Sequence, residues 1–262
     1  MTTHAVHHPQ AANMVLPGIR QVSFQHPLQW LRAGMQDMLK AWPLSLFYGV
    51  VFALLGYALV LGAADRPHLA LALTSGFLFV APLLATVFYF LSHRLEHRHK
   101  LPALWVPLLS WRANPVSLGL FALMLVFTLS AWERLSAILV GLFLNSSGIG
   151  NLADLLTLQT LQQHADFVLA YLAFGAVLAL LMFSLSVVSL PMLMHRKVDF
   201  ATALVTSFMA TRLNFLPMLL WGVLIAGLIA VGMASYFIAM VVIFPWLGHA
   251  SWHAYRDLIE AT

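Results

Sequence analysis

The sequence contains no cysteine, and this absence removes several kinds of site at once. Without thiols the chain forms no disulfide, no thiolate metal centre, no cysteine nucleophile and no covalent c-type haem attachment. Charge is scarce as well, because 8% of the 262 residues are charged, against about a quarter in an average soluble domain. With 61% hydrophobic residues, the composition excludes a water-soluble protein and indicates one that lies in a membrane.

Recognisable catalytic motifs are also lacking. The sequence has no GxSxG, no P-loop, no dinucleotide-binding fingerprint and no DxD-like carboxylate pair, and its nine acidic residues are scattered. An enzyme is therefore the less favoured class, although nothing excludes one. The 13 basic residues form no patch that would bind nucleic acid, since they punctuate apolar segments instead.

Apolar segments of about 20 residues, the length that crosses the hydrocarbon core as a helix, dominate the rest of the chain. Lipid offers the backbone no hydrogen-bonding partner, so these segments are predicted to be helices and the fold class to be all-α. The predicted spans are 44–64, 69–91, 115–134, 166–190, 215–233 and 234–252. The last two are too long together for one span and form a hairpin. We therefore expect six transmembrane helices arranged as three in-out-in hairpins.

The basic residues orient these spans. Arg66 and Arg134 fall on one side of the six-span arrangement, and the other eleven of the 13 fall on the opposite side. The eleven are Arg20, Arg32, Lys40, Arg94, Arg98, Lys100, Arg112, Arg196, Lys197, Arg212 and Arg256. Because basic residues favour the cytoplasmic side, both termini are expected in the cytoplasm.

Shorter segments on the cytoplasmic side complete a single-domain layout. Residues 1–27 are predicted to be a flexible tail, and residues 28–262 one membrane domain. In residues 28–42, Leu and Met recur at helical spacing opposite a polar face that includes Asp37, which predicts an amphipathic helix on the membrane surface. Asp199 is suited to cap a similar helix before the fifth span.

On the outer side, the third span reaches its twentieth residue at Arg134, which favours an interfacial position for Trp132, Glu133 and Arg134; the alternative is that Glu133 and Arg134 are functional charges within the membrane. The stretch 135–144 is too short to span and is expected to be a separate interfacial segment. Asn151 is suited to start a polar-faced outer helix.

Prolines recur at related positions and define a weak internal repeat. The odd-numbered spans begin with WPLSLFYG, NPVSLGLF and LPMLLWG, and the even-numbered spans contain VAPLLAT, SLPMLMH and IFPWLGH. Three duplicated hairpins would explain both series. Proline is also favoured in the first turn of any helix, so common ancestry and ordinary helix chemistry both remain open.

The six-span layout, the amphipathic lead-in and the closing segment FPWLGHASWHAYRDL, Phe244 to Leu258, resemble the DUF2189 family of uncharacterised bacterial integral membrane proteins. The resemblance covers about residues 28–260, and the closing segment is its sharpest part. It implies a multi-pass protein of the bacterial inner membrane and no established activity.

Histidines at the cytoplasmic ends of the spans are candidate metal ligands. His249 and His253 lie one helical turn apart, and His195 occupies the position of His249 in the preceding repeat unit. Two or three imidazoles without thiolates suit copper, zinc or haem iron. The alternative is that they contact lipid or helix ends among interfacial aromatic residues. His4, third in the chain once Met1 is removed, is either a square-planar Cu(II) or Ni(II) ligand or a chance histidine in the tail.

The loop HRLEHRHK, His93 to Lys100, combines histidines with cations. It is not the HExxH pattern, because Glu96 immediately precedes the second histidine. Its cations predict contact with anionic lipid head groups, with a metal site as the alternative. These lipid-contacting residues are Arg94, Arg98 and Lys100.

Two classes of function remain. One is an accessory or assembly protein that packs against another membrane complex, a respiratory complex being one option, or against further copies of itself. The other is a small transporter or a protein that handles metal or haem. A transporter is expected to show polar groups at mid-depth, and the mild candidates are Thr128, Ser184, Ser186 and Ser189. The lipid bilayer is a partner in either case.

Overall fold

Helices make up nearly all of the structure, a computed structural model that describes residues 16–63, 66–144 and 157–260. The described residues form α-helices and one 3-10 helix, η1 (Pro107–Ala113), and they contain no strand. The predicted all-α class is therefore confirmed. Asn151 and His4 lie outside the described residues.

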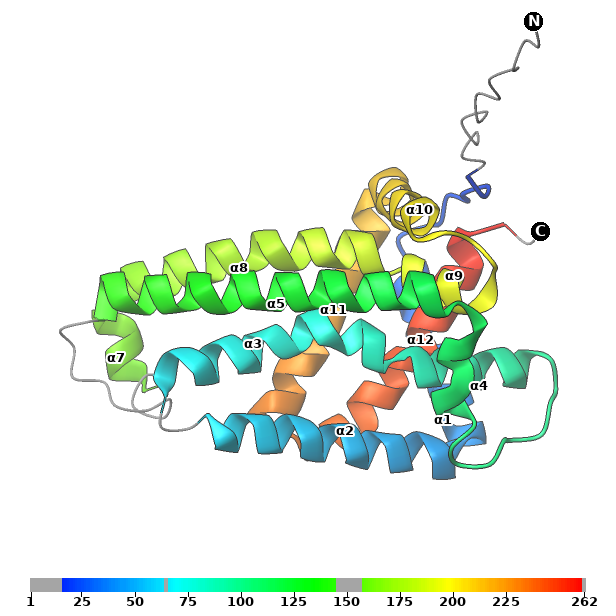
Figure 1. Cartoon of the computed structure of the whole chain (residues 1–262), viewed down its shortest axis with the longest axis horizontal. Helices are drawn as coiled ribbons and strands as arrows, with labels where there is room; N and C mark the ends of the chain where they lie inside the picture. The colour runs from blue at the N-terminus through cyan, green and yellow to red at the C-terminus, as the bar shows by residue number, and fades with distance from the viewer. Residues whose placement is uncertain (1–15, 64–65, 145–156, 261–262) are drawn as a thin grey trace, which may run out of the picture.

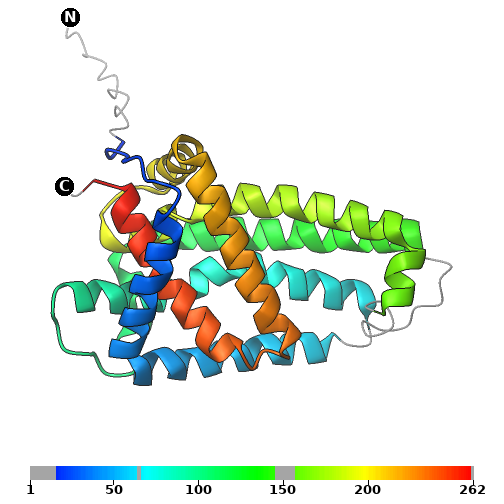
Figure 2. The same ribbon diagram turned by 180° about the vertical axis from the view of Figure 1, so that it is seen from behind.

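Four long helices run side by side along the long axis of the molecule (Figure 1). They are α2 (Trp42–Gly62), α3 (Pro67–Leu84), α5 (Pro115–Leu144) and α8 (Ala165–Ser186). Two further helices, α11 (Phe215–Ala234) and α12 (Met240–Leu258), cross them obliquely. Seen from behind, α12 packs against α1 (His26–Lys40) at the end of the bundle where the described chain begins (Figure 2).

Four helical stretches among the described residues are long and apolar enough to cross a membrane. Three are α2, α5 and α11, and the fourth is Ala165–His195, in which α8 leads into α9 (Ser189–His195). Their most apolar windows have mean hydropathies of 1.8 to 2.4. The membrane class is thus supported by four candidate spans, and the predicted number of six is not confirmed.

The second predicted span, 69–91, consists of two helices. α3 ends at Leu84 and α4 (Thr86–Glu96) continues after a break at Ala85. Pro82 lies inside α3 three residues before the break, and a proline removes one backbone hydrogen bond and crowds the turn that precedes it.

The sixth predicted span, 234–252, is displaced along the chain. Residues 235–239 form the turn after α11, with positive φ at Tyr236 and Phe237, so α12 begins at Met240 and continues to Leu258. Its last turns include Arg256 and Asp257. Because of this polar second half, α12 is not among the helices that composition marks as candidate spans.

The third predicted span extends beyond its expected end. α5 continues without interruption to Leu144, so the prediction of a separate outer segment over 135–144 is wrong. Trp132, predicted to lie at the depth of the interface, is buried between α5 and α3, where its indole N–H donates to Ser75 Oγ (2.8 Å), and its depth in the membrane stays a prediction. Tyr171 of α8 joins the same cluster through a hydrogen bond with Ser75 (3.1 Å).

The predicted amphipathic helix forms as α1, but its buried face differs from the prediction. Trp30, Gly34 and Asp37 are buried, whereas Leu28 is 58% exposed. Placing Asp37 on the outward polar face was therefore wrong. A Cβ atom at Gly34 would lie 2.5 Å from the backbone nitrogen of Ala250, so only glycine lets α1 approach α12 this closely.

The described ends of the chain lie together at one end of the bundle (Figures 1 and 2). Ile19 and Ile259 form an isolated antiparallel bridge, and the Arg20 backbone nitrogen donates to the Leu258 carbonyl (2.8 Å). Asn214 adds a side-chain hydrogen bond to the Arg20 carbonyl (3.0 Å). The described part of the predicted tail, from Gly18 onward, is thus held against α12.

Two short helices begin at side-chain caps. α10 (Phe200–Leu213) begins after Asp199, whose carboxylate accepts from the Thr202 backbone nitrogen (2.9 Å), so the cap predicted there is confirmed. α7 (Leu158–Gln163) is capped in the same way by Thr157.

Candidate functional site

His249 is fully buried where α12 meets α2 and α4. Its Nε2 atom lies 2.9 Å from Ser45 Oγ on α2, and its Nδ1 atom lies 2.8 Å from Ser92 Oγ on α4. The imidazole also packs against the ring of Phe88, with 5.5 Å between centroids. Both ring nitrogens therefore have a hydroxyl partner, and a metal ion would have to displace one of the two serines.

Ser92 connects His249 to the carboxylate of Asp37. Its hydroxyl donates to Asp37 Oδ2 (2.9 Å), so its only proton is used there and its oxygen must accept from His249 Nδ1–H. This assigns the Nδ1–H tautomer to His249, and Nε2 then accepts from Ser45. On the other side, His253 Nε2 donates to Asp37 Oδ2 (2.8 Å).

These five residues form one continuous chain of hydrogen bonds that joins α2, α12, α4 and α1, which we call the His249 network. Its members in order are Ser45, His249, Ser92, Asp37 and His253. A buried polar network of this kind stabilises a structure only when every member is satisfied, and here each contact is made.

Asp37 supplies the negative charge of the network. Its burial disfavours the ionised form, but the hydrogen bond and charge of His253 and the hydrogen bond from Ser92 outweigh this effect and hold the pKa of the carboxyl below its usual 3.8. Asp37 is therefore ionised at neutral pH. Lys40 Nζ is 3.7 Å away but largely exposed, and such pairs contribute little.

A second group of histidines lies at the end of α4. The His93 ring is 4.5 Å from the His97 ring and 5.2 Å from that of His195, measured between centroids. Trp252 stands edge-on to both His93 and His195, at 5.4 Å from each. Burial, and secondarily the nearby His97, lowers the pKa of His93 below 6.5, so this imidazole is mostly neutral at pH 7.

His195 thus joins His93, although the sequence placed it with His249 and His253. Its Nδ1 atom accepts from the Tyr255 hydroxyl (2.8 Å), which in turn accepts from Arg196 Nε (3.0 Å). No group of three or more His, Cys, Asp or Glu residues in the described part of the chain is arranged to hold a metal ion. The metal sites predicted at His195, His249 and His253 remain predictions.

A cavity of about 240 Å³, the histidine cavity, opens beside this second group. His93, His195 and Trp252 line one part of it, and Ser110 of η1 lines another. Glu96, the last residue of α4, links this helix to α12. Its carboxylate accepts hydrogen bonds from Arg256 Nη2 (2.8 Å) and from the Trp252 indole N–H (3.2 Å).

The three cations predicted to contact lipid lie at the rim of the same end. Arg94 donates to the Lys100 carbonyl (3.1 Å) and stacks over the Phe90 ring at 5.8 Å, while Arg98 and Lys100 are exposed. The segment that follows exposes Trp105, at 65%, among several leucines. Exposed aromatic residues beside cations are typical of a membrane interface.

Sequence analysis missed the partners of the histidines. Asp37, Ser45, Ser92 and Glu96 carry no recognisable motif, and their spacing from α12 is large. The one available signal was that Asp37 is an acidic residue in a chain with very few of them.

These features define an all-helical integral membrane protein whose buried histidine network lies where α12 packs against α1, α2 and α4. A family model described as a predicted integral membrane protein, DUF2189, matches residues 70–195, and the resemblance to that family is confirmed over this segment. The matched segment runs from α3 to α9 and includes His93 and His195, whereas the closing segment from Phe244 lies outside it. No curated protein and no solved structure gives a significant match to the chain.

Proposed function

We propose that the protein is an accessory or assembly factor of the bacterial inner membrane that packs against another membrane complex or against further copies of itself. The observation that carries this proposal is that the four hydroxyls named above as candidates for polar groups at mid-depth each bond to a carbonyl of their own helical stretch. Thr128 donates to the Met124 carbonyl, and Ser184 donates to that of Leu180. Ser186 and Ser189 do the same. Hydroxyls engaged in this way do not line a path for a polar solute, which favours packing over transport.

The proposed topology has six spans with both termini in the cytoplasm. Residues 69–91, in α3 and the first part of α4, would form the second span, and the first part of α12, up to residue 252, would complete the sixth. The bridge between Ile19 and Ile259 supports an even number of crossings, because it holds both ends of the described chain on one side. The excess of basic residues at that side favours the cytoplasm.

The surface proposed to meet the partner is the outer face of α8. In the most apolar window of Ala165–His195 only 6% of the residues are buried within the molecule, against 28–39% in the other three candidate spans. Leu172 (64% exposed) marks this face. A helix so little enclosed by its own chain is the one most available for packing against a second protein.

Site-specific photocrosslinking in native membranes tests this role. A photoreactive residue at Leu172 should crosslink to one protein that also copurifies stoichiometrically, or to a second copy of this chain. The matched control is Leu54 of α2, which is 62% exposed but lies outside the proposed contact. Lipid adducts alone at both positions, without a copurifying protein or a dimer, would contradict the accessory role.

A second candidate function is the handling of copper, zinc or haem iron. The close approach of His93 to His195 beside the histidine cavity favours it. Metal and haem analysis of purified protein lacking residues 2–12 tests this function, in comparison with the double variants His249→Ala/His253→Ala and His93→Ala/His195→Ala. If the parent protein holds no stoichiometric metal or haem after supplementation, this function is ruled out.

A further inference from the structure

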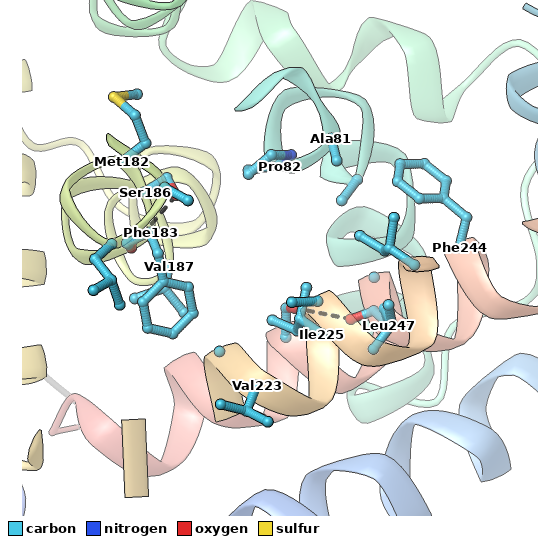
Figure 3. Close-up of a pocket in the computed structure, with 18 of the residues that line it drawn as sticks. Ala81, Pro82, Met182, Phe183, Ser186, Val187, Val223, Ile225, Phe244 and Leu247 are labelled. Carbon is cyan, nitrogen blue, oxygen red and sulfur yellow. Dashed lines mark hydrogen bonds between the residues drawn. The ribbon is translucent and has the colours of Figure 1, made fainter. Parts of the chain in front are cut away.

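A cavity of about 360 Å³, the apolar cavity, opens between α8 and α11 (Figure 3). Phe183 of α8 and Val223 of α11 stand on two sides of it, and Pro82 of α3 and Leu247 of α12 on the others. The volume lies within the range of about 300–1,000 Å³ that is typical of small-molecule sites.

The mouth of the apolar cavity faces the hydrocarbon of the bilayer. Leu180 and Val223 at its edge are 51% and 60% exposed, and both belong to candidate spans. None of the described residues that line it is charged, and its only side-chain hydroxyls are those of Tyr89, Ser186 and Ser251. An occupant must therefore be apolar over most of its length and carry no charge inside the cavity.

Two of these hydroxyls lie close together at the inner wall. Tyr89 is 3% exposed and its hydroxyl is near Ser251, whose own hydroxyl donates to the Leu247 carbonyl (2.8 Å). Tyr89 also lines the histidine cavity, so it borders both hollows. The inner wall thus offers a neutral hydrogen-bonding group at the end of an otherwise apolar space.

The extent of the lining distinguishes a lipid chain from a partner helix. It runs over Ala176–Val187 on α8 and Leu219–Ile229 on α11, which at 1.5 Å per residue is about 16 Å. The hydrocarbon core is about 30 Å thick, so a transmembrane partner would need a groove roughly twice as long. A single flexible chain that enters from one leaflet fits this length.

We propose that the apolar cavity binds one neutral single-chain lipid from the bilayer, with a hydroxyl or carbonyl group placed against Tyr89 and Ser251 and its hydrocarbon chain leading out between α8 and α11. This site is independent of the accessory role, because it uses the interior faces of α8 and α11 and not the outer face of α8.

Photolabelling of the purified full-length protein in phosphatidylcholine nanodiscs tests the site. The probes are a long-chain alcohol and the fatty acid of equal length, each with a diazirine in the chain, and adducts are mapped by mass spectrometry. The alcohol should label residues that line the cavity, and the fatty acid should label them several-fold less, because its carboxylate has no cation to pair with there.

Two glycines of α11 provide a matched pair of variants. A Cβ atom at Gly222 would make ordinary contact with the Phe183 ring (3.7 Å), so Gly222→Leu places a side chain in the cavity without a backbone clash. Gly227 has nothing within 4 Å, so Gly227→Leu adds the same side chain outside. Gly222→Leu should lose most of the cavity labelling, and Gly227→Leu should retain it.

Ser251→Ala tests the hydrogen-bonding end of the site. Loss of one neutral hydrogen bond should weaken alcohol binding about fivefold. It should leave the labelling by a chain-matched diazirine hydrocarbon without the hydroxyl unchanged. Labelling that avoids the lining residues, that favours the fatty acid, or that falls equally in Gly222→Leu and Gly227→Leu would overturn the proposal.

Discussion

Replacing Asp37 by alanine is the most direct test of the His249 network. The carboxylate accepts hydrogen bonds from Ser92 (2.9 Å) and His253 (2.8 Å), and the whole residue is 7% exposed. Asp37→Ala removes Oδ2, the one oxygen that accepts both hydrogen bonds, and leaves the hydroxyl and the imidazole N–H without their partner. We therefore expect the variant to fold less stably while it keeps its helices.

The magnitude follows from the two contacts. A hydrogen bond to a charged group contributes about 1.5–3 kcal/mol, and the removal of Asp37 also relieves the cost of burying its charge. Because the His253 side chain is 30% exposed, water can replace part of its lost contact. The net loss should be about 2–4 kcal/mol. Asp37→Asn retains one acceptor oxygen and should lose less.

Thermal unfolding in detergent, followed by the fluorescence of the eight tryptophans, measures this loss. The melting temperature of Asp37→Ala should fall on the order of 5–10 °C. The matched control is Asp166→Ala in the first turn of α8, where the aspartate is exposed and the change should be small. Equal shifts in the two variants would refute the role assigned to Asp37.

The stability difference between wild type and Asp37→Ala is also expected to depend on pH. The folded-state pKa of Asp37 lies below its usual 3.8, so its contribution to stability is fully present above the unfolded value and is lost as the pH falls through the folded value. The difference in melting temperature between wild type and Asp37→Ala should shrink as the pH falls below about 4. A difference that grows in that acid range would contradict the assigned pKa direction.

Three further predictions concern packing, lipid contact and topology. Gly34→Ala should lower the free energy of unfolding by about 1–3 kcal/mol, because the added methyl group meets the Ala250 backbone. Gly119→Ala adds a methyl group in open space and should not lower it, and thermal unfolding compares the two variants. Glutamine in place of the three rim cations should reduce copurified anionic lipid, measured by mass spectrometry, without a change in helical content. A reporter active only in the cytoplasm should work after Thr262 and fail within 146–163; activity at the second site would contradict the six-span proposal.

Composition and hydropathy alone determined that this is an all-helical membrane protein. Runs of about 20 apolar residues have no stable state in water, and in lipid they must satisfy their own backbone hydrogen bonds, so the sequence leaves few alternatives. The helix cap at Asp199 could also be predicted from the sequence, because a cap depends on residues within one helical turn.

The positions of helix breaks were harder to predict from the sequence. Pro82 and Pro245 lie in similar motifs, yet α3 breaks after the first and α12 continues through the second. Whether a proline interrupts a helix depends on the side chains that pack around it. The sequence does not display these neighbours.

Only the tertiary structure decided which residues surround the histidines. His249 bonds to Ser45 and Ser92, which are 204 and 157 positions away along the chain, and His253 bonds to Asp37, which is 216 away. Hydropathy places each helix in the bilayer but does not specify which faces meet. That choice depends on close packing, such as the approach of α1 to α12 at Gly34, and it brings Asp37 inside, where a helical pattern read in isolation had placed it outside.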